Sequence, residues 1–167
     1  VELPPAPARV AASELPVRWL FYTSGTTADP KGVQHTDASL WAAAKGMSIA
    51  LDMRTEDRVA FVFPFTHIGG INWLQSCLSY GFTHIIIESF ADPTTMPTLR
   101  REGVTLGSAG TVFHEAYLAA HRRSEHKPLF PDMRAFPGGG APKPPQLHYD
   151  LVSEMGGVGI LSGYGMT

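Results

Sequence analysis

The stretch Tyr22-Thr-Ser-Gly-Thr-Thr-Ala-Asp-Pro-Lys-Gly-Val33 places four hydroxyl side chains, two glycines and a lysine in one short loop. Hydroxyl groups, unobstructed backbone amides and an ammonium group are the partners that phosphate oxygens need. In a Walker A loop the lysine directly follows the second glycine, whereas Lys31 precedes Gly32 here. The pattern therefore predicts a phosphate-binding loop and disfavours a P-loop NTPase. A plain polar turn stays open as an alternative, since Ser, Thr, Gly and Pro are common in turns.

An apolar run comes directly before this loop, and similar runs follow at intervals along the chain. Each is short and apolar along its whole length, which is typical of strands covered on both faces of a parallel sheet. We expect strands at residues 18–22, 58–63, 84–88, 104–107, 133–136 and 158–161. We expect helices at residues 36–51, 68–79, 92–101, 111–122 and 144–154, the third with Asp92 as N-cap and Pro93 at its first position. The predicted fold class is α/β, a mostly parallel sheet with alternating helices on both faces.

The size and composition fit one compact domain. The 167 residues suffice for a single core, and the net charge of −2 lacks the basic excess of a nucleic-acid-binding protein. The single cysteine, Cys77, cannot form an internal disulfide, which favours a reducing cytoplasm. The most apolar stretch, residues 68–87, is interrupted by polar residues, and a membrane span needs about 20 nearly unbroken apolar residues. We therefore expect a cytoplasmic protein with no transmembrane segment and no nucleic-acid partner.

Residues 1–16 are rich in Pro and Ala and show no periodicity. This composition is typical of a linker, so we expect residues 1–16 to arrive from an upstream region. Residues 17–167 then form the folded part, and the chain as a whole is expected to be a piece of a longer polypeptide.

The loops after the predicted strands carry the unusual residues. In open α/β sheets, ligands bind at the carboxyl ends of the strands. The sequence therefore predicts that five loops lie on one rim of the sheet and form a single site. These loops are residues 23–32, 64–70, 108–110, 138–141 and 162–167.

Four of these loops carry motifs that resemble those of the acyl-CoA synthetase, peptide-synthetase adenylation and luciferase superfamily of adenylate-forming enzymes. The first is the hydroxyl-rich stretch quoted above, which is similar to the family's phosphate loop, with Ala28 where the family most often has Gly. The others are Phe63-Pro-Phe-Thr-His67, Gly138-Gly-Gly-Ala-Pro142 and Gly163-Tyr-Gly-Met-Thr167. The resemblance runs from about Trp19 to Thr167, the central part of the family's AMP-binding N-terminal domain.

The resemblance implies a two-step reaction with ATP, Mg2+ and coenzyme A. A carboxylate attacks the α-phosphate of ATP to give an acyl-adenylate and pyrophosphate, and coenzyme A then attacks the acyl carbon. The phosphate loop would hold the β- and γ-phosphates, Tyr164 would stack on adenine, and Thr167 would hold the α-phosphate. By the same resemblance, the nucleotide-binding residues are Thr23, Ser24, Gly25, Thr26, Thr27, Lys31, Gly139, Gly140, Ala141, Tyr164, Gly165 and Thr167.

His67 is expected to line the acyl pocket, although a histidine that caps a helix start is an alternative. Amino-acid activators of the family usually carry an Asp after this motif to bind the ammonium group, and residues 66–72 contain no carboxylate. The sequence therefore favours a fatty or other non-amino acid as substrate. An amino-acid adenylation domain and a non-catalytic nucleotide- or acyl-binding module are the alternatives.

The resemblance also implies parts that residues 1–167 do not contain. These are the magnesium-binding Glu, the ribose-binding Asp, and the catalytic Lys of a small C-terminal domain. We therefore expect no catalytic residue and no metal ligand within the chain, and no synthesis of acyl-CoA by residues 1–167 alone.

Overall fold

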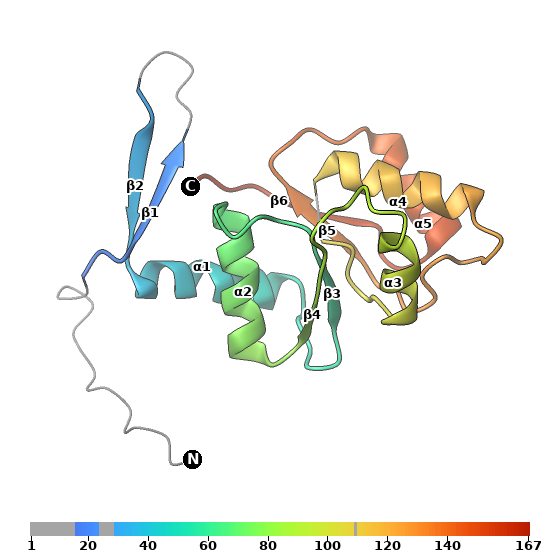
Figure 1. The fold of residues 1–167 in the computed structure, drawn as a ribbon, viewed down its shortest axis with the longest axis horizontal. Coiled ribbons are helices and arrows are strands. Elements are labelled where there is room, and N and C mark those ends of the chain that lie inside the picture. Colours follow the sequence, from blue (N-terminus) through green and yellow to red (C-terminus); the bar gives the residue numbers. More distant parts are fainter. Residues whose placement is uncertain (1–15, 24–28, 109) are drawn as a thin grey trace.

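Helices and strands alternate along most of the chain (Figure 1). The computed structural model describes residues 16–23, 29–108 and 110–167. In chain order the elements are β1 (Trp19–Thr23), β2 (Lys31–His35), α1 (Asp37–Ala50), β3 (Arg58–Phe61), α2 (Ile68–Tyr80), β4 (Thr83–Ile86), α3 (Thr95–Arg101), α4 (Thr111–Arg123), β5 (Phe136–Gly139), α5 (Pro145–Met155) and β6 (Ile160–Gly163).

β3 lies inside a parallel arrangement of strands. It pairs in parallel with β4 on one side, and on its other side Val59 forms a parallel bridge to Leu106. Leu106 in turn bridges to Ala135, directly before β5, which pairs in parallel with β6. The order across the sheet is therefore β4, β3, the Leu106 segment, β5 and β6. The predicted α/β fold with a mostly parallel sheet is confirmed.

The direction of winding changes at β3. The chain leaves β3 to form β4 on one side and then returns to form the Leu106 segment on the other side. Because parallel crossovers are right-handed, reversing the direction puts the connecting helices on opposite faces of the sheet. Figure 1 shows α1 and α2 on one side of the strands and α3, α4 and α5 on the other.

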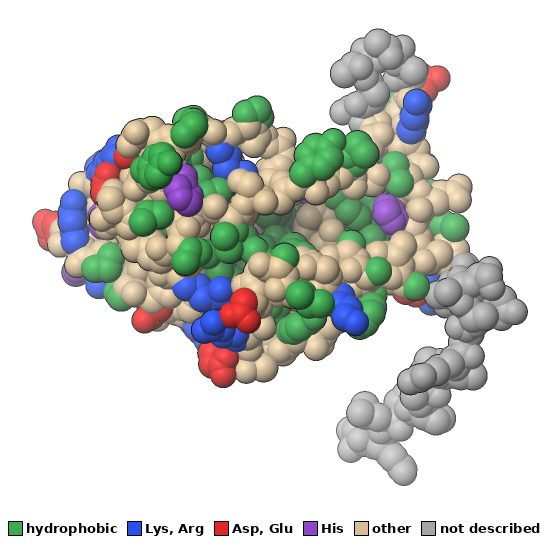
Figure 2. Space-filling view, turned by 180° about the vertical axis from the view of Figure 1, so that it is seen from behind, with side chains coloured by type: hydrophobic (Ala, Val, Ile, Leu, Met, Phe, Trp, Pro, Cys, Tyr) green, Lys and Arg blue, Asp and Glu red, His purple; other side chains and the backbone are tan. Residues whose placement is uncertain are grey.

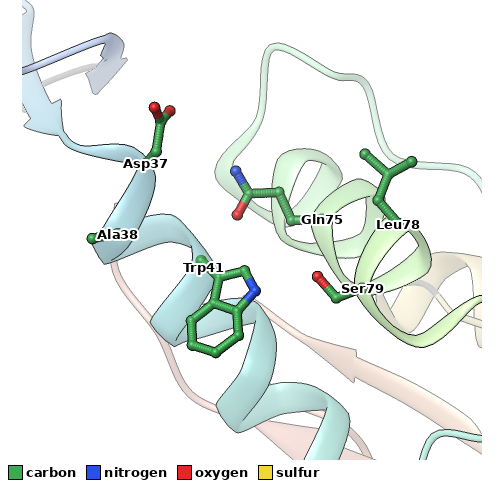
Figure 3. Close-up of a pocket in the computed structure, with 6 residues that line it drawn as sticks. All are labelled: Asp37, Ala38, Trp41, Gln75, Leu78 and Ser79. Carbon is green, nitrogen blue, oxygen red and sulfur yellow. The ribbon is translucent and has the colours of Figure 1, made fainter. Parts of the chain in front are cut away.

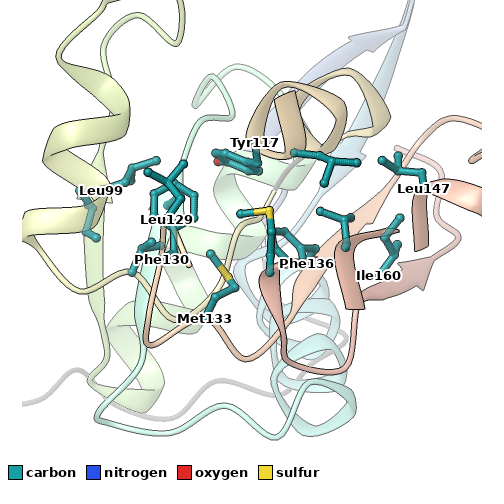
Figure 4. Close-up of a cluster of buried hydrophobic side chains, with 14 residues drawn as sticks. Leu99, Tyr117, Leu129, Phe130, Met133, Phe136, Leu147 and Ile160 are labelled. Atoms are coloured by element: carbon teal, nitrogen blue, oxygen red, sulfur yellow. The ribbon is translucent and has the colours of Figure 1, made fainter. Parts of the chain in front are cut away.

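Each face of the sheet has its own hydrophobic core. Ala60 and Ile85 belong to the larger cluster, which lies under α3, α4 and α5 (Figure 4). Val59 and Phe61, the strand neighbours of Ala60, belong instead to the cluster that packs against α1 and α2. The alternation follows from the period of two along a strand, and it explains why the strands are apolar throughout.

The first predicted strand has a different partner from the one expected. β1 pairs antiparallel with β2, a strand that the sequence analysis did not predict. A strand does form near residues 18–22, but the prediction that it is buried in the parallel sheet is wrong. Only one side of this hairpin is covered: Phe21 is buried in a small cluster with Leu40 and Ile71, while Leu20 and Tyr22 are exposed. The hairpin is thus half-buried and stands apart from the parallel sheet.

The last two strands lie two to three residues further along the chain than predicted, since β5 begins at Phe136 and β6 at Ile160. The predictions for residues 133–136 and 158–161 stop before the glycines, whereas β5 and β6 end at Gly139 and Gly163. Turn-forming residues here continue the ladder, with Gly138 opposite Ser162. The strand predicted at residues 104–107 is reduced to the bridges at Leu106.

The third helix begins later than predicted. α3 starts at Thr95 with Thr94 as its N-cap, so the prediction of Asp92 as N-cap and Pro93 as first helical residue is wrong. The Asp92 carboxylate accepts hydrogen bonds from the Thr94 amide at 2.7 Å and the Thr94 hydroxyl at 2.6 Å. Asp92 therefore stabilises a turn before the helix, as Asp side chains often do.

A buried ion pair ties together the amino ends of the strands. The carboxylate of Asp57, 3% exposed, accepts hydrogen bonds from Arg134 at 2.7 and 2.5 Å. The Arg54 amide and the Thr105 hydroxyl each add a bond of 2.9 Å. Burial opposes ionisation of Asp57, but these hydrogen bonds outweigh it and lower its pKa. Asp57 and Arg134 thus hold β3, the Leu106 segment and the start of β5 in place, at the edge opposite the candidate site.

No helix in the described part of the chain is long and apolar enough to cross a membrane.

Candidate functional site

Thr23 and Lys31 lie opposite each other where the β1–β2 hairpin opens into its loop. They form the last pair of the hairpin ladder, and Lys31 is exposed. The hairpin therefore holds the lysine at the mouth of the predicted phosphate loop. Four residues predicted to bind phosphate, Ser24, Gly25, Thr26 and Thr27, lie outside the described residues, as does Ala28.

Two loops diverge where the winding of the sheet reverses. Residues 62–67 follow β3, and residues 107 and 108 follow the Leu106 segment, its neighbour in the sheet. The helices that come next, α2 and α4, cover opposite faces of the sheet, so the chain leaves the carboxyl ends of these two neighbouring strands in opposite directions. Ligands bind at this topological position in open α/β sheets. The two loops therefore place His67 and Ser108 at the expected rim.

His67 is the N-cap of α2. Its Nδ1 accepts a hydrogen bond from the Gly69 amide at 3.0 Å, and its ring stacks on Phe63 with 5.9 Å between centroids. Because Nδ1 accepts, the proton of the neutral ring lies on Nε2, which no described residue contacts. His67 is exposed. His67 therefore caps the start of α2, as the alternative reading expected. Its Nε2–H still faces solvent and is available as a hydrogen-bond donor.

Gly70 sets how closely α2 approaches the loop before it. A Cβ atom at Gly70 would lie 2.3 Å from the carbonyl oxygen of Pro64, far inside van der Waals contact. Only glycine permits this approach. The loop of residues 64–67 is consequently held against the first turn of α2, and with it the position of His67.

The glycine-rich turn and the last motif lie side by side. In the parallel β5–β6 ladder, Gly139 is opposite Gly163, and a Cβ atom at Gly139 would lie 2.6 Å from the Gly163 oxygen. Gly140 follows with φ of 80°, a left-handed conformation that favours glycine. Two stretches that are more than twenty residues apart in sequence therefore meet at one end of the sheet, and both lead into exposed chain.

The remaining predicted site residues follow these strand ends. Ala141 and Gly165 are exposed, and Tyr164 is 93% exposed with its ring in solvent. Thr167 is half-buried. Figure 1 shows the C-terminal segment running from β6 toward the β1–β2 hairpin. The space-filling view shows a hollow edged by hydrophobic side chains between the hairpin side and the α4–α5 side (Figure 2).

Two buried residues lie beneath the rim: Ser108, which belongs to a predicted rim loop, and His114, which the sequence analysis did not assign to the site. Ser108 is fully buried and donates a 2.6 Å hydrogen bond to the Ala60 oxygen of β3. His114 is also fully buried, and its Nε2 lies 3.2 Å from the Gly107 oxygen. Burial lowers the pKa of His114 to about 4, so the ring is neutral near pH 7. Sequence gave no signal for either role, because both depend on contacts between distant segments.

A separate hollow of about 470 Å³ lies between α1 and α2 (Figure 3). It contains none of the predicted site residues, and Trp41, half of whose surface is exposed, forms much of its wall. The residues that line it are Asp37, Ala38, Trp41, Gln75, Leu78 and Ser79. This groove is therefore not part of the candidate site.

The described residues contain no group of three or more His, Cys, Asp or Glu side chains that could hold a metal ion.

Comparisons with known proteins identify relatives of this chain. The chain is 30% identical over 148 residues to 2-succinylbenzoate–CoA ligase of Bacillus cytotoxicus, covering 89% of this chain and 30% of that protein. The structure of O-succinylbenzoate coenzyme A synthetase from Bacillus subtilis with AMP superimposes with a TM-score of 0.75 at 30% identity, over 89% of this chain and 29% of that one. A Mycobacterium tuberculosis fatty acyl CoA synthetase gives 0.77 at 27% identity, over 88% and 28%.

The chain thus spans about a third or less of the length of these relatives. The model of the AMP-binding enzyme family matches residues 4–167, nearly the whole sequence. With the motifs at one rim of the sheet and this match along the chain, the protein belongs to the AMP-binding enzyme family.

Proposed function

We propose that residues 17–167 are the central part of the nucleotide-binding domain of an acid–CoA ligase. The whole protein would activate a carboxylic acid with ATP and transfer the acyl group to coenzyme A. One observation carries this proposal: Gly139 and Gly163, one from each predicted nucleotide motif, lie opposite each other at the carboxyl ends of β5 and β6. The family match and the named ligases support the same reaction class.

In the first step a carboxylate oxygen attacks the α-phosphorus of ATP, and the bond to pyrophosphate breaks. The chemistry asks the protein mainly to position the reactants and to stabilise charge. Lys31, held at the mouth of the hairpin loop, would place a positive charge against the β- and γ-phosphates. In the second step the sulfur of coenzyme A attacks the acyl carbon, and AMP leaves.

The adenosine would lie along the exposed ends of β5 and β6. Nothing lies within 4 Å of a Cβ atom at Gly140, so a flat base can approach its backbone closely. Tyr164, almost fully exposed, would stack on the adenine. Thr167 would contact the α-phosphate.

The acid substrate would lie beside His67 at the carboxyl end of β3, with the Nε2–H of the ring directed to its carboxylate. No carboxylate occurs in residues 66–72 to hold an ammonium group, so we propose a non-amino acid. The relatives named above act on an aryl or a fatty acid, and either class fits this proposal.

Lys31→Ala in the whole protein tests the phosphate site. We expect the KM for ATP to rise about ten- to a hundredfold, because a charge-assisted hydrogen bond contributes roughly 1.5–3 kcal/mol. Lys45→Ala is the matched control, since Lys45 lies on α1 over the ring of Trp41, 5.1 Å from its centroid, away from the rim. Unchanged ATP kinetics in Lys31→Ala would remove Lys31 from the site.

A further inference from the structure

A pocket lies between the C-terminal ends of α3 and α4, away from the candidate site. It has a volume of about 590 Å³. α4 begins directly after the rim loop at Gly110 and runs for 13 residues, so its far end lies about 20 Å from the rim at 1.5 Å per residue. The residues that line the pocket are Met96, Pro97, Arg100, Arg101, Ala120, Arg123, Ser124, His126 and Leu129. We name it the arginine pocket.

Three guanidinium groups line the arginine pocket, and no carboxylate does. Arg100 is held in place because its Nη1 donates to the oxygens of Pro128 at 2.9 Å and Leu129 at 2.7 Å. Arg101 pairs only with the neighbouring Glu102, at 3.1 Å. Arg123 forms no ion pair with any described carboxylate. The pocket is therefore positively charged in a chain whose net charge is −2.

The two adjacent arginines at the end of α4 have opposite surroundings. Arg122 points to α5, where it pairs with Asp150 at 2.8 Å and Glu154 at 2.5 Å. Arg123 turns to the other side and lines the pocket. Neighbouring residues of an α-helix are turned by about 100° from each other, so Arg122 is neutralised by α5 while Arg123 adds its charge to the pocket.

Apart from the arginines, Ser124 and His126, the pocket wall is apolar and packs against the main core. Leu129 is 6% exposed and belongs to the main core, and Met96 and Ala120 pack against that core. The volume lies within the range of about 300–1,000 Å³ that small-molecule sites occupy. A hollow with an apolar wall and several guanidinium groups suits an oxyanion carried on an apolar body.

We propose that the arginine pocket binds a small organic anion, with a carboxylate or phosphate group held by Arg100 and Arg123 and an apolar body against Met96 and Leu129. The site is separate from the proposed nucleotide and acid sites. It could therefore be filled while the enzyme turns over, as an effector site requires.

Isothermal titration of the whole protein with 1-naphthyl phosphate tests this proposal. We expect saturable binding that weakens about ten- to a hundredfold in Arg123→Gln, the change expected for one lost charge-assisted contact. Arg122→Gln is the matched control on the same helix and should leave the affinity unchanged. Lys31→Ala should also leave the affinity for 1-naphthyl phosphate unchanged. A loss of affinity in Lys31→Ala would mean that the compound binds at the nucleotide site.

Titrations with 1-naphthol and an acidic peptide complete the test. 1-Naphthol should bind at least tenfold more weakly than the phosphate, because it lacks the anion. Equal affinity of wild type and Arg123→Gln for 1-naphthyl phosphate would overturn the proposal. Equal losses of affinity in Arg122→Gln and Arg123→Gln would also overturn it. Binding of poly-glutamate without binding of 1-naphthyl phosphate would overturn it too, because that result indicates a surface for an acidic protein.

Discussion

His67 makes two contacts that substitution can separate. Its Nδ1 caps α2 through the Gly69 amide, while its Nε2 is left for the proposed acid substrate. His67→Asn should keep the cap, because Asn is among the best N-cap residues, whereas His67→Ala should cost about 1 kcal/mol of stability. Both substitutions should raise the KM for the acid about tenfold and leave the KM for ATP nearly unchanged, if one hydrogen bond of about 1.4 kcal/mol is lost.

Melting curves and separate KM values for acid and ATP check this prediction. A normal acid KM in His67→Asn would show that the histidine serves only the helix.

Asp57 should make the protein sensitive to acid. Burial would by itself raise its pKa, but the hydrogen bonds from Arg134, the Arg54 amide and Thr105 lower it below the unfolded value of about 3.9. The unfolded chain therefore binds the proton more readily than the folded one. The contribution of Asp57 to stability is present above about pH 4 and is lost as the pH falls through the lower folded-state pKa.

Asp57→Asn should destabilise the protein by about 3 kcal/mol at pH 7, since it leaves Arg134 without its partner charge. Its stability should also fall less than that of the wild type between pH 4 and pH 2. Urea unfolding at several pH values measures both effects. If the free energy of unfolding falls with pH equally in the wild type and in Asp57→Asn, Asp57 is not the acid-sensitive group.

At the scale of elements, α2 depends on glycine for its place at the rim. Gly70→Ala would put a Cβ atom 2.3 Å from the Pro64 oxygen, so the loop of residues 64–67 must move. We expect a loss of about 1–3 kcal/mol from overpacking. We also expect at least a tenfold fall in kcat/KM for the acid, because small displacements of positioning residues are costly.

Gly46→Ala is the matched substitution in α1. Nothing lies within 4 Å of a Cβ atom at Gly46, so this change should stabilise the helix by about 0.5–1 kcal/mol and leave the kinetics unchanged. Thermal unfolding and acid kinetics of the two variants make the comparison. Equal effects at both positions would mean that the contact with Pro64 does not matter.

The sequence predicted elements well where one local signal dominated. All five helices were placed, because each has helical spacing and a boundary residue, although Asp92 was misread since an Asp that begins a turn and one that caps a helix look alike. β2 was missed because Lys31 and Gly32 appear as loop residues until β1 pairs with them. The contact of Gly139 with Gly163 and the burial of His114 arise from distant segments, which periodicity cannot reveal.

At the scale of the whole molecule, the sheet order and the motif loops explain one another. The reversal at β3 sends the chain in opposite directions from two neighbouring strand ends, and the parallel pairing of β5 and β6 places the two glycine motifs next to each other. The chain covers about 30% of the length of its curated relatives, so the remaining groups of the proposed reaction would lie outside it. The lysines of the chain are Lys31, Lys45, Lys127 and Lys143, and the resemblance assigns none of them to the family's catalytic lysine.

The central claim is that this rim activates a carboxylic acid through an adenylate. Acid-dependent release of pyrophosphate from ATP, measured with a panel of fatty, aryl and amino acids, tests it most directly. We predict release by the whole protein with a fatty or aryl acid, no release with amino acids, and none by residues 1–167 alone. Absence of release by the whole protein with every acid, or release by residues 1–167 at a rate near that of the whole protein, would contradict the account.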